Sequence, residues 1–205
     1  MGGGLLKVIG VTGGVATGKT TVARILSSFL KASIIDADEI VHKLLRPGED
    51  VWQRVIGVFG REILKEDLSI DRKKLSQIVF SNPNHRRKVE SIVHPEVKRI
   101  MREELKHLES SGENAVVMDI PLLFEAKMES MVDVIIVVVR DEHRQLETLQ
   151  QERNLSINEA KKRIKSQIPL SEKVRGAHFV VDNNGRLQET KRQVKEICVS
   201  IRRCE

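Results

Sequence analysis

The sequence predicts an α/β fold with a parallel sheet, on two observations. Five short runs rich in Val and Ile are continuously apolar rather than alternating, which is typical of strands covered on both faces. Segments with helical periodicity separate these runs, so right-handed crossovers are expected to connect parallel strands. The predicted strands are residues 7–12, 32–36, 115–120, 132–139 and 178–182.

A glycine-rich loop lies between the first predicted strand and the helical pattern at residues 21–30. It matches the phosphate-binding pattern Gly-x-x-x-x-Gly-Lys-Ser/Thr, and a strand before it with a helix after it is the context that this loop requires. The sequence therefore predicts the three-layer core of a P-loop NTPase. The residues expected to bind the nucleotide are Gly13, Gly14, Val15, Ala16, Thr17, Gly18, Lys19, Thr20 and the following Thr21.

The residue types in this loop suit ATP with Mg²⁺. Gly13 and Gly18 permit the positive backbone angles that turn N–H groups around a phosphate, and the next helix adds the positive end of its dipole. Lys19 is predicted to neutralise the β- and γ-phosphates, and the Thr20 hydroxyl is predicted to bind the metal. Asp119 ends the third strand, where a carboxylate can reach Mg²⁺ through water, although an Asp-Ile-Pro sequence also simply ends strands.

Composition favours a single globular domain that binds a small anionic substrate. The chain has 205 residues, of which 40% are hydrophobic and 31% charged, and its formal net charge is +6. Aromatic residues make up only 3%, and basic residues alternate with acidic ones, which argues against nucleic acid as the principal ligand. No apolar run approaches the ~20 residues that a membrane span needs. The spacing of Cys198 and Cys204 suits neither a metal site nor a disulfide, so we expect a reducing, cytoplasmic environment. The expected assembly is a monomer or a weak homo-oligomer.

Two stretches are longer than a simple crossover requires. Residues 40–113 contain helical patterns at 40–45, 51–59, 71–80 and 95–108, and this helical insertion is the expected place for an acceptor substrate. Residues 141–172 are polar and helical, with a break near Asn154 and a capping box from Ser156 to Glu159. They are predicted to form a lid, the alternative being two solvated surface helices.

Two carboxylates follow the second predicted strand. In an extended chain Asp36 and Asp38 would project to the same side, so one can accept the proton of an attacking hydroxyl while the other caps a helix or holds metal-bound water. Helix capping alone explains the pair about as well.

Three further residues allow two interpretations each. His94 precedes Pro95 between two helical patterns, which favours a hinge or helix start over catalysis. Arg72 can bind phosphate, but a charged first helical turn capped by Asp71 is the commoner arrangement. Asn183 follows the last strand in a turn, and its amide is also able to read a base edge.

Taken together, these residues resemble the dephospho-CoA kinase family over nearly the whole chain. The resemblance implies transfer of the ATP γ-phosphoryl group to the ribose 3′-hydroxyl of dephospho-CoA, with Asp38 as general base. It also implies that Arg72, His94 and Pro121 lie near the acceptor and Asn183 near the adenine of ATP. The matching segments, in order, are residues 11–14, 35–38, 47–48, 70–75 with 78–80, 94–95, 119–125, 167–169 and 182–185.

The chain departs from the family in the predicted lid. The family usually has Gln-Leu-x-Arg-Leu-x-x-Arg-Asp there, with arginines facing the transferred phosphoryl group, whereas Thr148 and Glu152 occupy those positions here. We hypothesise that Arg153, helped by Arg144 or Arg163, replaces them. Two rivals stay open: another P-loop kinase acting on a nucleoside or nucleotide, and a lid-impaired homologue that binds ATP or CoA without turnover.

Overall fold

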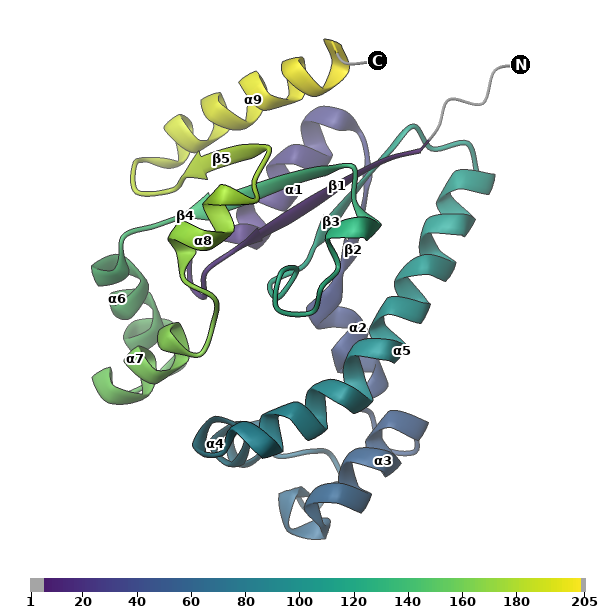
Figure 1. Ribbon diagram of the computed structural model, residues 1–205, viewed down its shortest axis with the longest axis vertical. Coiled ribbons are helices and arrows are strands. Elements are labelled where there is room, and N and C mark those ends of the chain that lie inside the picture. Colours follow the sequence, from purple (N-terminus) through teal and green to yellow (C-terminus); the bar gives the residue numbers. More distant parts are fainter. Residues whose placement is uncertain (1–5, 204–205) are drawn as a thin grey trace. The chain divides into compact units, whose positions relative to one another are not determined.

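The computed structural model describes residues 6–203 and divides into two compact units (Figure 1). Within the described residues, the sheet unit comprises residues 6–36 and 104–203, and the helical unit comprises residues 37–103.

The sheet unit contains the predicted parallel sheet. Its five strands are ordered β2-β3-β1-β4-β5, and every neighbouring pair is parallel. The chain moves from β3 on one side of β1 to β4 on the other, so the carboxyl end of β1 lies where open α/β sheets bind ligands. The strands are β1 (Lys7–Gly13), β2 (Ser33–Asp36), β3 (Ala115–Asp119), β4 (Val134–Val139) and β5 (Phe179–Asp182).

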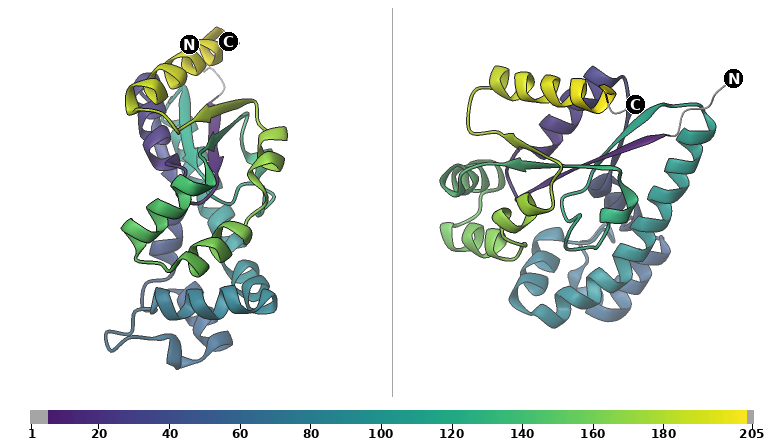
Figure 2. Two further views of the ribbon diagram at one scale, coloured as in Figure 1. Left: turned by 90° about the vertical axis from the view of Figure 1, so that its left-hand side faces the viewer. Right: turned by 45° about the horizontal axis from the view of Figure 1, so that its top comes forward.

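Helices cover both faces of this sheet, which confirms the predicted α/β class. Figures 1 and 2 show α1 (Lys19–Leu30) and α9 (Leu187–Arg203) together on one face, where they pack against each other. On the other face α8 (Leu170–Arg175) contacts β4, and the segment after β3, which includes η2 (Glu129–Met131), buries Leu123.

Two short helices, α6 (Glu142–Arg153) and α7 (Ile157–Lys165), follow β4. The predicted break is confirmed: α6 ends at Arg153 and is followed by its C-cap Asn154, whose φ is 49°, and both hydrogen bonds of the Ser156–Glu159 capping box are present. Leu149 and Ala160 from these helices pack against Val15 of the glycine loop. The two helices therefore contact the nucleotide loop directly.

The helical unit is built from four helices and one short 3₁₀ turn. They are α2 (Ala37–Leu44), α3 (Asp50–Phe59), η1 (Arg61–Ile63), α4 (Arg72–Ser81) and α5 (Pro83–Ser110), the last of which continues into the sheet unit.

The expectation of a hinge or helix start at His94-Pro95 is wrong, because both residues lie inside α5. A proline in a helix interior usually breaks the helix, since it lacks the N–H that the carbonyl four residues earlier needs. Here buried residues on both sides hold the helix together, Ile92 and Val93 before the proline and Val97 and Met101 after it. Tertiary burial thus overrides the local signal.

The fold also bears on membrane spanning and on the cysteines. Within residues 6–203, no helix is both long and apolar enough to cross a membrane. Cys198 is buried on α9 as a free thiol, and Cys204 lies outside the described residues.

Candidate active site

The loop after β1 has the backbone angles that the sequence predicted. Gly13 has a φ of 152° and Gly18 a φ of 86°. A Cβ atom on Gly13 would come within 2.3 Å of the Val138 carbonyl oxygen, and one on Gly18 within 2.3 Å of the Asn183 Nδ2. Glycine is therefore required at both positions for conformation and for space.

Side chains hold the carbonyl groups of this loop. In a trans peptide the C=O and the following N–H point in opposite directions, so a donor that holds a carbonyl on one side aims an N–H to the other. Repeated along a loop, this arrangement makes a concave anion site. The donors are Lys173 Nζ to Gly13 O (3.3 Å), Lys19 Nζ to Gly14 O (2.6 Å), Arg140 Nη1 to Ala16 O (3.4 Å) and Asn183 Nδ2 to Thr17 O (2.8 Å).

Lys173 and Glu125 form a buried ion pair under the loop that the sequence did not suggest. Their charged atoms lie 2.8 Å apart, and the two side chains are 0% and 7% exposed. Glu125 also accepts from the Ile168 amide at 3.0 Å, and Lys173 reaches the Pro121 carbonyl at 3.5 Å. Glu125 stood in a family motif without a role, and Lys173 carried no local signal at all.

The structure brings together the two candidate metal residues. The Thr20 hydroxyl donates to Asp119 Oδ2 at 2.8 Å, and Asp119 is only 2% exposed. Both side chains offer oxygen, which suits Mg²⁺, an ion that typically takes one or two protein ligands plus waters and phosphates. Among the described residues no cluster of three His, Cys, Asp or Glu side chains forms a complete metal site. The donor set thus fits a magnesium ion held jointly with a nucleotide.

Asp36 and Asp38 do not share an extended segment, so the geometry expected for them is wrong. Asp36 ends β2, and Asp38 lies in the first turn of α2, because the helix starts at Ala37. Asp36 instead stands in register with Asp119 of the neighbouring strand β3. Asp36 and Asp119 are therefore both at the carboxyl edge of the sheet.

Arg72 begins α4, with Asp71 as its cap. The Asp71 carboxylate accepts from the amides of Lys73 and Lys74, each at 3.0 Å, as the sequence predicted. The Arg72 guanidinium hydrogen-bonds the His42 ring on α2. His42 is four residues after Asp38, so it shares a helix face with that carboxylate.

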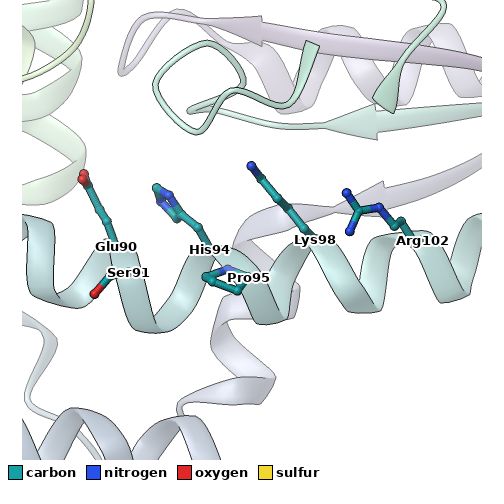
Figure 3. A pocket seen from close by; sticks show the side chains of 6 residues that line it. All are labelled: Glu90, Ser91, His94, Pro95, Lys98 and Arg102. Atoms are coloured by element: carbon teal, nitrogen blue, oxygen red, sulfur yellow. The ribbon is translucent and has the colours of Figure 1, made fainter. Parts of the chain in front are cut away.

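His94 lines an open pocket on α5 with a volume of about 430 Å³ (Figure 3). The remaining lining residues are Glu90, Ser91, Pro95, Lys98 and Arg102, and Figure 3 shows the long side chains, spaced four apart, on one side of the helix. Burial lowers the pKa of His94, as do Lys98 and Arg86, while Glu90 raises it. Lys98 and Arg102 are not among the residues predicted from the sequence, although they follow His94 at i+4 and i+8, a spacing that places all three on one helix face.

The remaining predicted residues lie at separate places in the sheet unit. The Pro121 carbonyl accepts from the Thr12 hydroxyl at 3.3 Å, and Asn183 Oδ1 accepts from Thr190 at 2.9 Å. Arg144 donates to the Asn184 carbonyl. Arg153 is the exposed last residue of α6.

A parallel sheet in this strand order, with a phosphate loop after β1 and helices packed on that loop, defines a P-loop kinase. The dephospho-CoA kinase family model matches residues 7–189. The chain therefore belongs to the dephospho-CoA kinase family.

Individual relatives agree with this assignment. A dephospho-CoA kinase of Carboxydothermus hydrogenoformans is 49% identical over 193 residues, covering 94% of this chain and 93% of the relative. Among solved structures, a Thermus thermophilus protein superposes with a TM-score of 0.79 at 28% identity, covering 96% of this chain and 97% of that one. A dephospho-CoA kinase from Campylobacter jejuni superposes with a TM-score of 0.68 at 28% identity, covering 98% and 99%.

Proposed function

We propose that the protein transfers the γ-phosphoryl group of ATP to the ribose 3′-hydroxyl of dephospho-CoA, producing coenzyme A and ADP. The observation that carries the proposal is the nucleotide loop, with its carbonyls held by side chains and the Thr20–Asp119 pair at its end, in a chain of this family.

The loop binds the phosphates of ATP. Its N–H groups and the start of α1 surround the phosphate oxygens, and Lys19 neutralises charge on the β- and γ-groups as the bridging bond lengthens. Thr20 and Asp119 would hold Mg²⁺, which would screen the phosphate charges. Asn183 lies beside the adenine while its amide also holds the Thr17 carbonyl.

The acceptor side belongs to the helical insertion, residues 40–113. Asp38 takes the proton of the 3′-hydroxyl while the hydroxyl oxygen bonds to the γ-phosphorus. The bond from this phosphorus to the β–γ bridging oxygen breaks at the same time and releases ADP. Arg72 and the α5 pocket, with His94, Lys98 and Arg102, supply donors for the anionic acceptor. The family resemblance adds Pro121 to the residues expected to bind the acceptor.

Residues 141–172 act as a lid within this single kinase domain. Their contacts with Val15, including a 2.8 Å hydrogen bond from the Val15 amide to Gln167, support the proposal because they join the lid to the nucleotide loop. Closure would exclude water from the transferred group. Thr148 and Glu152 favour one alternative, a nucleotide-binding homologue without turnover.

Product analysis separates these possibilities. The protein is incubated with ATP, Mg²⁺ and, in turn, dephospho-CoA, adenosine and nucleoside monophosphates, and the products are weighed. We expect a gain of one phosphoryl group on dephospho-CoA alone. Phosphorylation of another acceptor would support the rival kinase, and ATP binding without any product would support the homologue that lacks turnover.

Two substitutions test the residue roles. Lys19→Met should lower kcat by about 100-fold or more in a folded protein. Asp38→Asn should lower kcat by roughly 10²- to 10⁴-fold with little change in dephospho-CoA affinity. Asp36→Asn is the matched comparison and should cost less, so a larger loss at Asp36 would exchange the two roles.

A further inference from the structure

Arg140, directly after β4, is held between the nucleotide loop and the lid helix α6. Its Nη1 donates to the Ala16 carbonyl at 3.4 Å and to the Thr148 hydroxyl at 3.2 Å. Its own carbonyl accepts from the buried Gln145 side chain at 2.7 Å. The residue is thus fixed at its backbone and along one edge of its side chain.

The other edge of the guanidinium includes a buried nitrogen whose hydrogen bonding is not accounted for. The Nε atom is buried and has no hydrogen-bond partner within the described part of the chain. A buried donor left unpaired is costly, and a ligand that supplies the acceptor accounts for such a group. Because Nη1 makes both observed side-chain bonds, the Nε and Nη2 edge remains, and this edge can receive two oxygens of a phosphoryl group.

Among the described residues, the positive charge of Arg140 has no carboxylate paired with it, in contrast to the charge of Lys173. Lys173 reaches the same loop, but Glu125 neutralises it at 2.8 Å. Across residues 6–203, no carboxylate forms an ion pair with Arg140. A phosphoryl-transfer site needs positive charge around the terminal phosphate as the bond to the leaving group breaks.

We propose that Arg140 binds the terminal phosphoryl group of ATP through its Nε and Nη2 edge and stabilises that group during transfer. This inference rests on the proposed kinase function. Arg140, which directly follows β4, would supply the positive charge that an arginine at position 148 usually supplies in this family. The hydroxyl of Thr148 holds the guanidinium at that place, and the Ala16 carbonyl sets its distance from the loop.

A purely structural role is the competing explanation. Ala16 is a non-glycine residue with a φ of 58°, a conformation that side chains disfavour. Arg140 holds the carbonyl of this residue, so in this explanation the loss of Arg140 acts only by letting the loop relax. Ala16→Gly removes the strain, and it separates the two explanations when combined with loss of the arginine.

The test compares Arg140→Met and Arg140→Lys with Arg192→Met, an exposed arginine of α9 paired with Glu196. For each variant, kcat is measured with dephospho-CoA, and the dissociation constants of ATP and ADP are measured by calorimetry. We expect Arg140→Met to lower kcat by about 100-fold or more, and to weaken ATP binding while ADP binding is unchanged. Arg140→Lys should recover only part of the rate, since lysine cannot bind two oxygens side by side. Arg192→Met should match the wild type.

Two further substitutions are tested in the Arg140→Met protein. Thr148→Arg added to Arg140→Met should restore part of the rate, because it returns a positive charge to the same place. Equal weakening of ATP and ADP, or recovery of the rate by Ala16→Gly in the Arg140→Met protein, would overturn the proposal in favour of a loop-holding role. If the wild type fails to phosphorylate dephospho-CoA, the proposed function falls, while the ATP and ADP affinities still decide the role of Arg140.

Discussion

Breaking the buried ion pair between Lys173 and Glu125 should destabilise the sheet unit more than any surface substitution. The Lys173 side chain is 0% exposed and Glu125 is 7% exposed. In Lys173→Met the lost cation leaves a buried carboxylate without its counter-charge, which typically costs about 3–5 kcal/mol. For a chain of this length, each 1 kcal/mol shifts Tm by roughly 2–4 °C. The expected fall in Tm is therefore about 6–20 °C.

The pair is best isolated by a double-mutant cycle. Glu125→Gln keeps an oxygen for the Ile168 amide but removes the charge, so the double variant has no unpaired buried ion. Its loss of stability should be smaller than the sum of the single losses by about 1–3 kcal/mol. Lys191→Met, at an exposed position of α9, is the control and should change stability by less than ~0.5 kcal/mol.

The stability of the sheet unit has to be measured with signals that arise in that unit. Trp52, the chain's single tryptophan, is in the helical unit, so its fluorescence does not report on the sheet. Hydrogen exchange of β1 and β4 peptides, together with thermal unfolding followed by circular dichroism, observes the affected unit. A cost below ~1 kcal/mol for Lys173→Met, or strict additivity in the cycle, would refute the reasoning.

Three further predictions concern local features. Gly18→Ala should abolish ATP binding measured by calorimetry, because φ is 86° and the added Cβ meets Asn183; binding like that of the wild type would show that the loop tolerates it. Asp71→Ala should destabilise the helical unit by about 1 kcal/mol in a urea titration followed by Trp52 fluorescence, whereas Asp71→Asn should retain the cap. Burial lowers the pKa of His94, so its contribution to stability is complete above the ordinary value of 6.5 and is lost as pH falls through the folded pKa. His94→Gln should therefore reduce the loss of stability in acid, and an unchanged pH profile would contradict this.

Much of the sheet unit could be predicted because its signals are local. The strands predicted at 7–12 and 132–139 are largely apolar runs, which are typical of a sheet covered on both faces, and the structure has them as Lys7–Gly13 and Val134–Val139. The loop angles at Gly13 and Gly18 follow from residue type, and so does the capping box at Ser156. Each of these features depends on residues within about one turn of one another.

The errors arose where tertiary contacts outweigh a local rule. Pro95 predicted a helix boundary, but burial of Ile92 and Met101 carries α5 through it. Asp38 was expected in extended chain, yet α2 begins one residue before it. In both cases the competing energy comes from packing, which local periodicity does not contain.

The sequence by itself determined the class of fold, the nucleotide loop and the family. Only the tertiary structure decided which side chains support that loop: Lys173 with Glu125, Asn183 on Thr17, and Arg140 on Ala16. Arg140 and Ala16 are 124 positions apart, and Asn183 and Thr17 are 166 apart. A charge or an amide leaves no periodic signal for a partner at that separation. Its role is set when the parallel strands bring their carboxyl ends to one edge, because β1, β4 and β5 deliver these residues there together.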